Sequence, residues 1–464
     1  GCSPSSSDSP GAAARGNAAA AAAGEGSAGA GDPYYPTDGN GGYDVTGYDL
    51  DVSFDPTPKH LDGRARITAN ATMALRRFNL DLIGFDVRSV TVNQRPAGFA
   101  REGDHELVIT PADSIAPGDS FVVEVAYAGT PGRPTGGALG DNGWHTSDSG
   151  GVFVAGEPQS ASSWYPVNET PRDKATFRLA ARVPDGWTVV SNGLEEGATQ
   201  ADGWTTFRWS EQTPVASYLT TFAVDRFTIA RSQLADGTPV VDAYAPGTEG
   251  KRAAEARLPE VLQFLSTRFG PYPQRAAGGI FVSADIGFSL ETQTRPIFAR
   301  WADLDTIVHE NAHQWFGDSV SVDSWADICL NECLASYAQW LWEEAKENRV
   351  LDDAFRQAVE RTRGNARFWS NRLYDMGAGH EFRGVYDKGV LATHALRRQI
   401  GEPAFDRVLR EWPAAHRDGN ASWPEFERFV TEVAGQDLRG FFDAWFRGDR
   451  LPDDGYLFPG SLRG

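Results

Sequence analysis

The chain has 464 residues and a formal net charge of −20 at pH 7. This length exceeds that of one small domain, and a content of 41% hydrophobic and 11% aromatic residues excludes a chain that is disordered throughout. The acidic balance argues against nucleic-acid binding, which requires basic surfaces, and no apolar run reaches the roughly 18 residues of a transmembrane helix.

The first 32 residues are dominated by Ala, Gly, Ser and Pro. Such a segment buries too little apolar surface to offset the entropy of ordering it, so we expect residues 1–32 to form a disordered tether. Within it, Cys2 precedes a run of Ser and Pro, as in a processed bacterial lipoprotein, although Gly1 does not fit that processing. The pattern predicts a lipid on Cys2, with an incidental Cys as the alternative.

The excess of Arg over Lys is typical of a high-GC bacterial genome. Together with the lipoprotein pattern, it predicts an extracytoplasmic protein, either a cell-surface lipoprotein or a secreted one. Contact with a membrane is expected only through the lipid on Cys2.

Residues 33–229 are predicted to form a β domain. From Tyr48 to Phe54 apolar and polar residues alternate, which is typical of a half-buried strand, and the run from Phe121 to Tyr127 repeats this pattern. Gly and Pro separate these runs from further expected strands at 104–110, 203–209 and 216–224.

Residues 230–464 are predicted to form a second, mainly helical domain. The segment 253–269 is amphipathic and stops at Gly270-Pro271. A short β segment is expected at 279–292. Further helices are expected at 329–346, 351–364, 386–400, 422–434 and 436–447.

An HExxH motif spans His309 to His313, on a helix that we expect Asp305 to cap and Gly317 to end. Residues four apart share one helix face, so both imidazoles can reach a single metal ion, and Glu310 is placed as a general base. A catalytic zinc needs a third protein ligand and one open position. Glu332 on the next helix is the candidate, and one Zn²⁺ is expected; a metal-free pair of core histidines is the alternative.

The run from Val308 to Gly317, followed by Leu330-Asn331-Glu332 and Ala335-Ser336-Tyr337, resembles the aminopeptidase N family of zinc metallopeptidases, the gluzincins. The resemblance covers residues 41–452. It implies a multidomain α+β fold, in which an N-terminal β-sandwich or saddle domain precedes a thermolysin-like, mainly α catalytic domain with a small mixed sheet. Many family members add a helical C-terminal cap domain, and we expect a short form without it.

The resemblance also implies roles for three further residues. Val385-Tyr386-Asp387-Lys388-Gly389 matches the family's catalytic Tyr motif, so Tyr386 is expected to donate to the oxyanion. Glu291, and Glu157 a few residues before Trp164-Tyr165-Pro166, are expected to bind the substrate's α-ammonium group. Two carboxylates at this place would select a free N-terminus over an internal peptide bond.

Four residues have less specific expected roles. Phe288 and Leu290 replace the Gly and Met of the family's amine-binding segment and are expected to shape the first substrate pocket. Asp327 and Asn331 are expected to hydrogen-bond to the metal ligands and so orient them, with simple helix capping as the alternative.

Cys329 and Cys333 flank Glu332, where the family usually has Trp and Gly. Residues four apart on a regular helix place their sulfur atoms poorly for a bond, so we expect two buried thiols. A strained disulfide or an adventitious metal contact is the alternative.

These features predict a monomeric zinc aminopeptidase that acts on peptides with a free N-terminus and binds no nucleic acid. One alternative is a zinc endopeptidase of thermolysin type, which would lack Glu157 and Glu291 at an amine pocket. Another is a catalytically silent surface protein that binds peptides.

Overall fold

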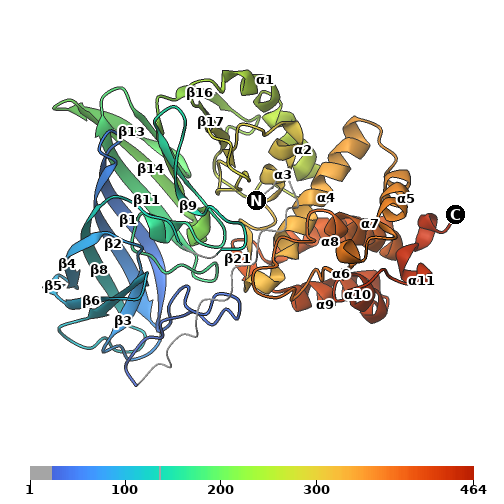
Figure 1. The fold of residues 1–464 in the computed structure, drawn as a ribbon, viewed down its shortest axis with the longest axis horizontal. Coiled ribbons are helices and arrows are strands. Elements are labelled where there is room, and N and C mark those ends of the chain that lie inside the picture. Colours follow the sequence, from blue (N-terminus) through green and yellow to red (C-terminus); the bar gives the residue numbers. More distant parts are fainter. Residues whose placement is uncertain (1–22, 135–136) are drawn as a thin grey trace. The chain divides into compact units, whose positions relative to one another are not determined.

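The computed structural model describes residues 23–134 and 137–464. They form two compact units. Unit 1 contains Ala253–Pro273 and Ala302–Gly464, and unit 2 contains the described residues up to Arg252 together with Gln274–Trp301. In Figure 1 the strands of unit 2 run from blue to yellow, and most helices of unit 1 are orange to red. A β-rich part followed by a mainly helical part confirms the predicted fold class.

The largest sheet of unit 2 has eight strands in the order β13-β14-β11-β1-β2-β8-β4-β5. In β1 the predicted alternation is confirmed, because Leu50, Val52 and Phe54 are buried. Leu50 pairs with Leu179 in a parallel ladder and with Ala65 in an antiparallel one. The strands are β13 (Leu194–Ala201), β14 (Trp204–Val215), β11 (Ala175–Pro184), β1 (Tyr43–Asp55), β2 (His60–Ala71), β8 (Ser120–Gly129), β4 (Asp86–Val92) and β5 (Arg95–Pro96).

Three smaller sheets complete unit 2, in the orders β12-β15-β10-β9, β3-β7-β6 and β16-β17-β18-β19. The first contains β12 (Thr188–Ser191), β15 (Phe222–Asp225), β10 (Val152–Ala155) and β9 (Gly143–Thr146). The second contains β3 (Phe78–Asp81), β7 (Glu106–Thr110) and β6 (Gly98–Glu102). The third contains β16 (Thr228–Gln233), β17 (Pro239–Tyr244), β18 (Ala277–Phe281) and β19 (Ile297–Phe298).

The β16–β19 sheet lies in unit 2, whereas the predicted boundary between residues 229 and 230 falls within β16 and assigns the rest of this sheet to the catalytic domain. Its buried residues Val241 and Ile280 share one hydrophobic core with Phe153 and Trp209 from the earlier part of the chain. Burial against a distant segment, which local periodicity does not reveal, therefore sets this boundary. Of the predicted β segment 279–292, only residues 279–281 lie in a regular strand, β18.

The described part of the predicted tether, residues 23–32, is ordered onto unit 2. Glu25 forms ion pairs with Arg76 and Arg77, at 3.0 and 2.9 Å. Its backbone also bridges to Arg77. The predicted tether is therefore wrong for these residues, because charge pairing and backbone bonds compensate for their small side chains. Residues 1–22, with Cys2 and its predicted lipid, lie outside the described residues.

Unit 1 is built from helices and one two-stranded sheet, β20 (Val320–Val322) with β21 (Gly419–Ala421). The predicted helix 329–346 is confirmed at both ends, whereas the predicted helix 253–269 is split in two. The helices are α1 (Arg252–Glu255), which begins at the last residue of unit 2, then α2 (Leu258–Phe269), α3 (Leu304–Ala312), α4 (Cys329–Lys346), α5 (Leu351–Thr362), α6 (Ala366–Ser370), α7 (Lys388–Ile400), α8 (Glu402–Ala415), α9 (Trp423–Ala434), α10 (Arg439–Trp445) and α11 (Asp454–Leu457).

Helix α8 is absent from the sequence prediction, and two prolines fall within it. Pro403 occupies the first turn, where the missing N–H has no intrahelical partner to lose, and Pro413 lies in the last turn. Among the described residues, no helix combines the length and apolar character needed to span a membrane.

Candidate metal centre

Helix α3 presents the HExxH motif. Its N-cap is Asp303, whose backbone is extended and whose carboxylate accepts from the Thr306 N–H at 3.4 Å. The predicted cap, Asp305, lies inside the first turn instead, so it is not the N-cap residue of this helix. The helix ends at Ala312 rather than at Gly317, and His313 is its C-cap.

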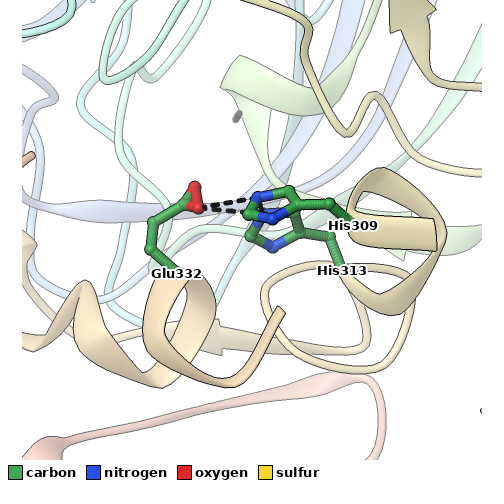
Figure 2. A group of neighbouring side chains, drawn as sticks. All are labelled: His309, His313 and Glu332. Carbon is green, nitrogen blue, oxygen red and sulfur yellow. Dashed lines mark hydrogen bonds and ion pairs between the residues drawn. The ribbon is translucent and has the colours of Figure 1, made fainter. Parts of the chain in front are cut away.

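The first turn of α4 brings Glu332 to the two histidines (Figure 2). Glu332 Oε2 lies 3.2 Å from His309 Nε2 and 3.0 Å from His313 Nε2, and the two Nε2 atoms are 3.1 Å apart. All three side chains are fully buried. We call these residues the His–His–Glu triad; the structure brings together the three predicted metal ligands.

The second nitrogen of each imidazole decides which atom faces a metal. His309 Nδ1 lies 2.9 Å from Gln339 Oε1, and His313 Nδ1 lies 2.8 Å from the Phe316 carbonyl. Both partners accept hydrogen bonds, so each Nδ1 carries the proton and each Nε2 directs its lone pair toward Glu332. Two neutral imidazoles and one carboxylate form a donor set that catalytic zinc uses, so the triad fits a zinc ion.

Burial and close contact shift the pKa values of His309 and Glu332 within the triad. Burial lowers the pKa of His309, which keeps the imidazole neutral. Burial alone would raise the pKa of Glu332, but the proximity of His313 and His309 holds it well below its usual range, so the carboxylate is ionised. An ionised carboxylate beside two neutral imidazoles favours a cation between them.

Gln339 is a functional candidate that the sequence reasoning missed. It lies seven residues after Glu332 on α4, which is close to two full helical turns, so both side chains project from the same face. That spacing is a sequence signal, but many polar residues share it without touching a ligand.

Glu310 and Tyr386 lie beside the triad. Glu310 is fully buried, and one of its carboxylate oxygens lies within 4.8 Å of a ring nitrogen of His313. The rings of Tyr386 and His309 have centroids 6.0 Å apart. Asp387 then caps α7 by accepting from the Lys388 N–H at 2.7 Å, which places Tyr386 directly before the helix.

Asp327 and Asn331, the two residues expected to orient the metal ligands, have different surroundings. The carboxylate of Asp327 accepts from the backbone N–H of Ser324 at 3.1 Å and of Trp423 at 2.8 Å, as the capping alternative predicts. Burial raises its pKa to about 6. Asn331 lies beside Gly317, where an added Cβ would come within 3.2 Å of the Asn331 amide and 3.3 Å of His313 Nδ1. The supporting role of Asn331 stays a prediction.

The two predicted amine-binding residues lie together in unit 2. Glu157 and Glu291 are fully buried, and they have carboxylate oxygens within 4.8 Å of one another. Glu291 follows an isolated bridge between Leu290 and Ile297. Two buried carboxylates at this distance repel each other, and a cation between them would relieve that repulsion.

The predicted pocket residues Phe288 and Leu290 lie in the hydrophobic core of unit 2. Their exposed fractions are 1% and 0%, and the core also contains Phe153 and Trp209. The ring of Phe288 also contacts that of His145, with centroids 6.1 Å apart. Their contribution to a substrate pocket stays a prediction.

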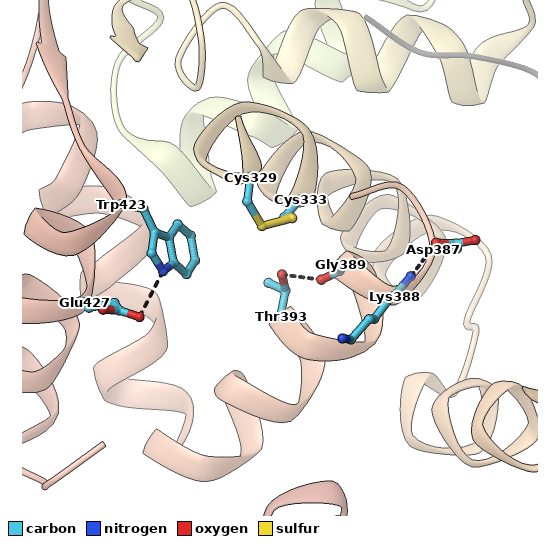
Figure 3. Close-up of a disulfide and its surroundings, with 8 residues drawn as sticks. All are labelled: Cys329, Cys333, Asp387, Lys388, Gly389, Thr393, Trp423 and Glu427. Atoms are coloured by element: carbon cyan, nitrogen blue, oxygen red, sulfur yellow. Dashed lines mark hydrogen bonds between the residues drawn. A yellow bond between two sulfur atoms is a disulfide. The ribbon is translucent and has the colours of Figure 1, made fainter. Parts of the chain in front are cut away.

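Cys329 and Cys333 form a disulfide, which corrects the expectation of two thiols (Figure 3). Their Cα atoms are 4.7 Å apart, within the range that a disulfide spans. The expectation assumed a regular helix. However, the N–H groups of Asn331 and Glu332 both bond to the Ile328 carbonyl at 2.9 Å, where the 3-10 turn Trp325–Asp327 runs into α4.

Comparison with family models gives two matches in the same order as the two parts of the chain. The peptidase M1 N-terminal domain matches residues 45–219, and the peptidase family M1 domain matches residues 290–445. The second match contains the whole His–His–Glu triad.

Among curated proteins, the chain is 22% identical to "Probable aminopeptidase 1" of Saccharolobus solfataricus, over 80% of this chain and 49% of that protein. It is 23% identical to "Aminopeptidase N" of Streptomyces lividans, over 79% of this chain and 45% of that protein. The chain thus spans about half the length of these relatives.

Among solved structures, the chain resembles an M1 zinc metallopeptidase from Deinococcus radiodurans, with 28% identity and a TM-score of 0.84. The match covers 92% of this chain and 98% of that one. A variant of a two-domain M1 zinc metallopeptidase bound to L-tryptophan gives 27% identity and a TM-score of 0.85, over 92% and 99% of the two chains.

Proposed function

The chain belongs to peptidase family M1, the aminopeptidase N-like gluzincins, and from this membership we propose that it is a zinc-dependent aminopeptidase that removes the N-terminal residue of peptides. The observation that carries the proposal is the buried His–His–Glu triad, in which both Nε2 atoms and a carboxylate oxygen converge. We propose that His309, His313 and Glu332 hold one Zn²⁺.

The residues beside the triad are proposed to carry out separate steps of peptide hydrolysis. Zinc in this place supplies a Lewis acid that polarises the scissile carbonyl and makes hydroxide available near neutral pH. Glu310 accepts the proton of the attacking water and passes it to the leaving amine. The hydroxyl of Tyr386 donates to the carbonyl oxygen as negative charge develops on it.

Glu157 and Glu291 are proposed to bind the α-ammonium group of the substrate. Their proximity within unit 2 and their burial support this role, because an ammonium group between them would form charge-assisted hydrogen bonds with both. Neighbouring M1 structures hold L-tryptophan, L-arginine and Tyr-Ser-Ala, each with a free α-amino group. The paired carboxylates favour an aminopeptidase over an endopeptidase of thermolysin type.

A panel of aminoacyl chromogenic amides tests the proposal. We expect hydrolysis that a chelator abolishes and added zinc restores, and that falls by about 10³-fold in Glu310→Ala. Glu291→Gln and Glu157→Gln should raise KM for free-amine substrates while leaving the zinc content unchanged. Chelator-resistant hydrolysis, or faster cleavage of the N-acetylated substrate than of the free amine, would refute the proposal.

We further propose that the protein is monomeric and works outside the cytoplasm, with a lipid on Cys2. The disulfide between Cys329 and Cys333 supports the location, because such bonds persist in oxidising compartments. Intact mass of the protein purified from its native membrane tests the lipid on Cys2.

A further inference from the structure

The Cys329–Cys333 disulfide encloses one of the three proposed metal ligands. Only Leu330, Asn331 and Glu332 lie between the bonded cysteines, and Glu332 supplies the triad's carboxylate. Both cysteines are fully buried, so the bond is part of the interior of unit 1. The covalent ring therefore constrains the backbone that carries the metal carboxylate.

The start of α4 continues from the 3-10 turn Trp325–Asp327, and the N–H groups of Asn331 and Glu332 bond to the Ile328 carbonyl at 2.9 Å. Its N-cap residue, Ile328, makes no side-chain hydrogen bond to the first turn, whereas Asp303 caps α3 with a reciprocal box. Backbone hydrogen bonds therefore hold this turn, and the disulfide adds a covalent link across the same residues.

The other side of the disulfide contacts the helix that follows Tyr386. A Cβ atom added to Gly389 would lie 2.6 Å from Cys333 Sγ, so the sulfur fills the space that any larger residue would need. Figure 3 shows the sulfur pair facing the first turn of α7, with Thr393 donating to the Gly389 carbonyl at 2.7 Å. The bond thus lies between the turn that carries Glu332 and the turn that follows Tyr386.

We propose that this disulfide is a positioning element of the metal centre, and that zinc retention therefore depends on the oxidation state of the two cysteines. Opening the ring removes this covalent link from the turn and allows the Glu332 carboxylate to move away from the two Nε2 atoms. The inference rests on the proposed function only in taking zinc as the metal.

The redox step is a thiol–disulfide exchange. Two glutathione thiols reduce the bond to the Cys329 and Cys333 thiols and are themselves oxidised to glutathione disulfide. If zinc binds the oxidised protein more tightly than the reduced one, linkage requires that zinc opposes reduction by the same factor. The coupling can therefore be measured either as the effect of the disulfide on zinc binding or as the effect of zinc on disulfide reduction.

The first experiment measures zinc release to a colorimetric chelator from the whole zinc-loaded chain. Supporting contacts of metal ligands typically change affinity by about 10- to 100-fold, so release from Cys329→Ser/Cys333→Ser should be at least about tenfold faster than from the oxidised wild type. Asn365→Ala, which removes the α6 cap that accepts from Phe368 N–H, is the matched control and should release zinc at the wild-type rate. Equal release from the disulfide variant and the wild type would overturn the proposal.

The second experiment needs no variant and covers the case in which the double substitution fails to fold. Wild-type protein is equilibrated in glutathione buffers with and without zinc, and free thiols are counted by mass after alkylation. Zinc should lower the equilibrium constant for reduction by about tenfold, the factor expected for zinc affinity. A constant that zinc leaves unchanged would contradict the proposal. Both readouts are independent of peptide hydrolysis, so an inactive protein would refute the proposed function alone.

Discussion

Two buried histidine–carboxylate groups, one in each unit, offer similar atoms to a metal. In unit 1 these are the His–His–Glu triad. In unit 2, His105 Nε2 lies 2.7 Å from Glu106 Oε2 and 3.9 Å from Asp81 Oδ1, and all three residues are at least nine-tenths buried. We call these three residues the Asp–His–Glu group. Proximity and burial do not separate the two groups.

The partner of the second ring nitrogen does separate them. His105 Nδ1 bonds to the Asp104 carboxylate, so the ring has acids at both nitrogens. Although burial lowers the pKa of His105, Glu106 and Asp81 raise it to about 10, so the ring is an imidazolium. The imidazolium itself supplies the cation that the carboxylates need. In the triad, neutral acceptors hold both Nδ1 protons, and the cation has to come from outside.

The largest expected effect comes from removing one histidine from each group. His313→Ala should lose its zinc, and its rate of amide hydrolysis should fall at least about 10³-fold, because one metal ligand is missing. His105→Ala should keep one equivalent of zinc and nearly all its activity. Metal analysis and amide hydrolysis on both variants check this. Zinc lost from His105→Ala, with His313→Ala still loaded, would reverse the comparison.

The stability of the Asp–His–Glu group gives the next largest effect. Removing the imidazolium leaves buried carboxylates without their cation, so His105→Gln should lower the free energy of unfolding by about 3 kcal/mol. A raised folded pKa contributes stability that is complete below the unfolded pKa, about 6.5, and is lost as pH rises through about 10. Denaturant unfolding of both proteins across this range should show the difference shrinking with pH; a constant difference would contradict the ion pair.

The local features of the triad were predictable from sequence, because they depend on helical spacing. The i, i+4 histidines share a face of α3, and α4 has the predicted bounds. The cap of α3 was misplaced because Asp303 and Asp305 are both plausible caps in sequence, and only backbone conformation separates them.

Features that depend on distant contacts were not predictable. The order of residues 23–32 depends on ion pairs from Glu25 to Arg76 and Arg77. The disulfide depends on a tightened turn at Ile328 that no residue pattern marks. The sequence of the Asp–His–Glu group also gave no signal, because His105 and Glu106 are adjacent and have no helical ligand spacing.

Tyr386 is a further difference between the two groups. Its ring lies beside His309 of the triad, and its hydroxyl is proposed to contact the substrate there. Tyr386→Phe should lower kcat by about 10²-fold, the usual effect of losing one oxyanion donor. Zinc content and the affinity for a substrate analogue should stay unchanged, since the aromatic ring remains. Steady-state kinetics and metal analysis check this, and an unchanged kcat would remove Tyr386 from the proposed chemistry.

The smallest effect tests the argument about ring nitrogens directly. Gln339→Ala removes the acceptor on His309 Nδ1 and should lower zinc affinity by about tenfold, because the imidazole loses its fixed tautomer and orientation. Gln339→Glu instead places a carboxylate there, as Asp104 does for His105. In the metal-free protein it should raise the pKa of His309, so zinc must then displace a proton and binding should weaken as pH falls. Competition with a chelator at several pH values measures both variants. If Gln339→Glu binds zinc as the wild type does at every pH, the partner of the second nitrogen does not decide which group holds a metal.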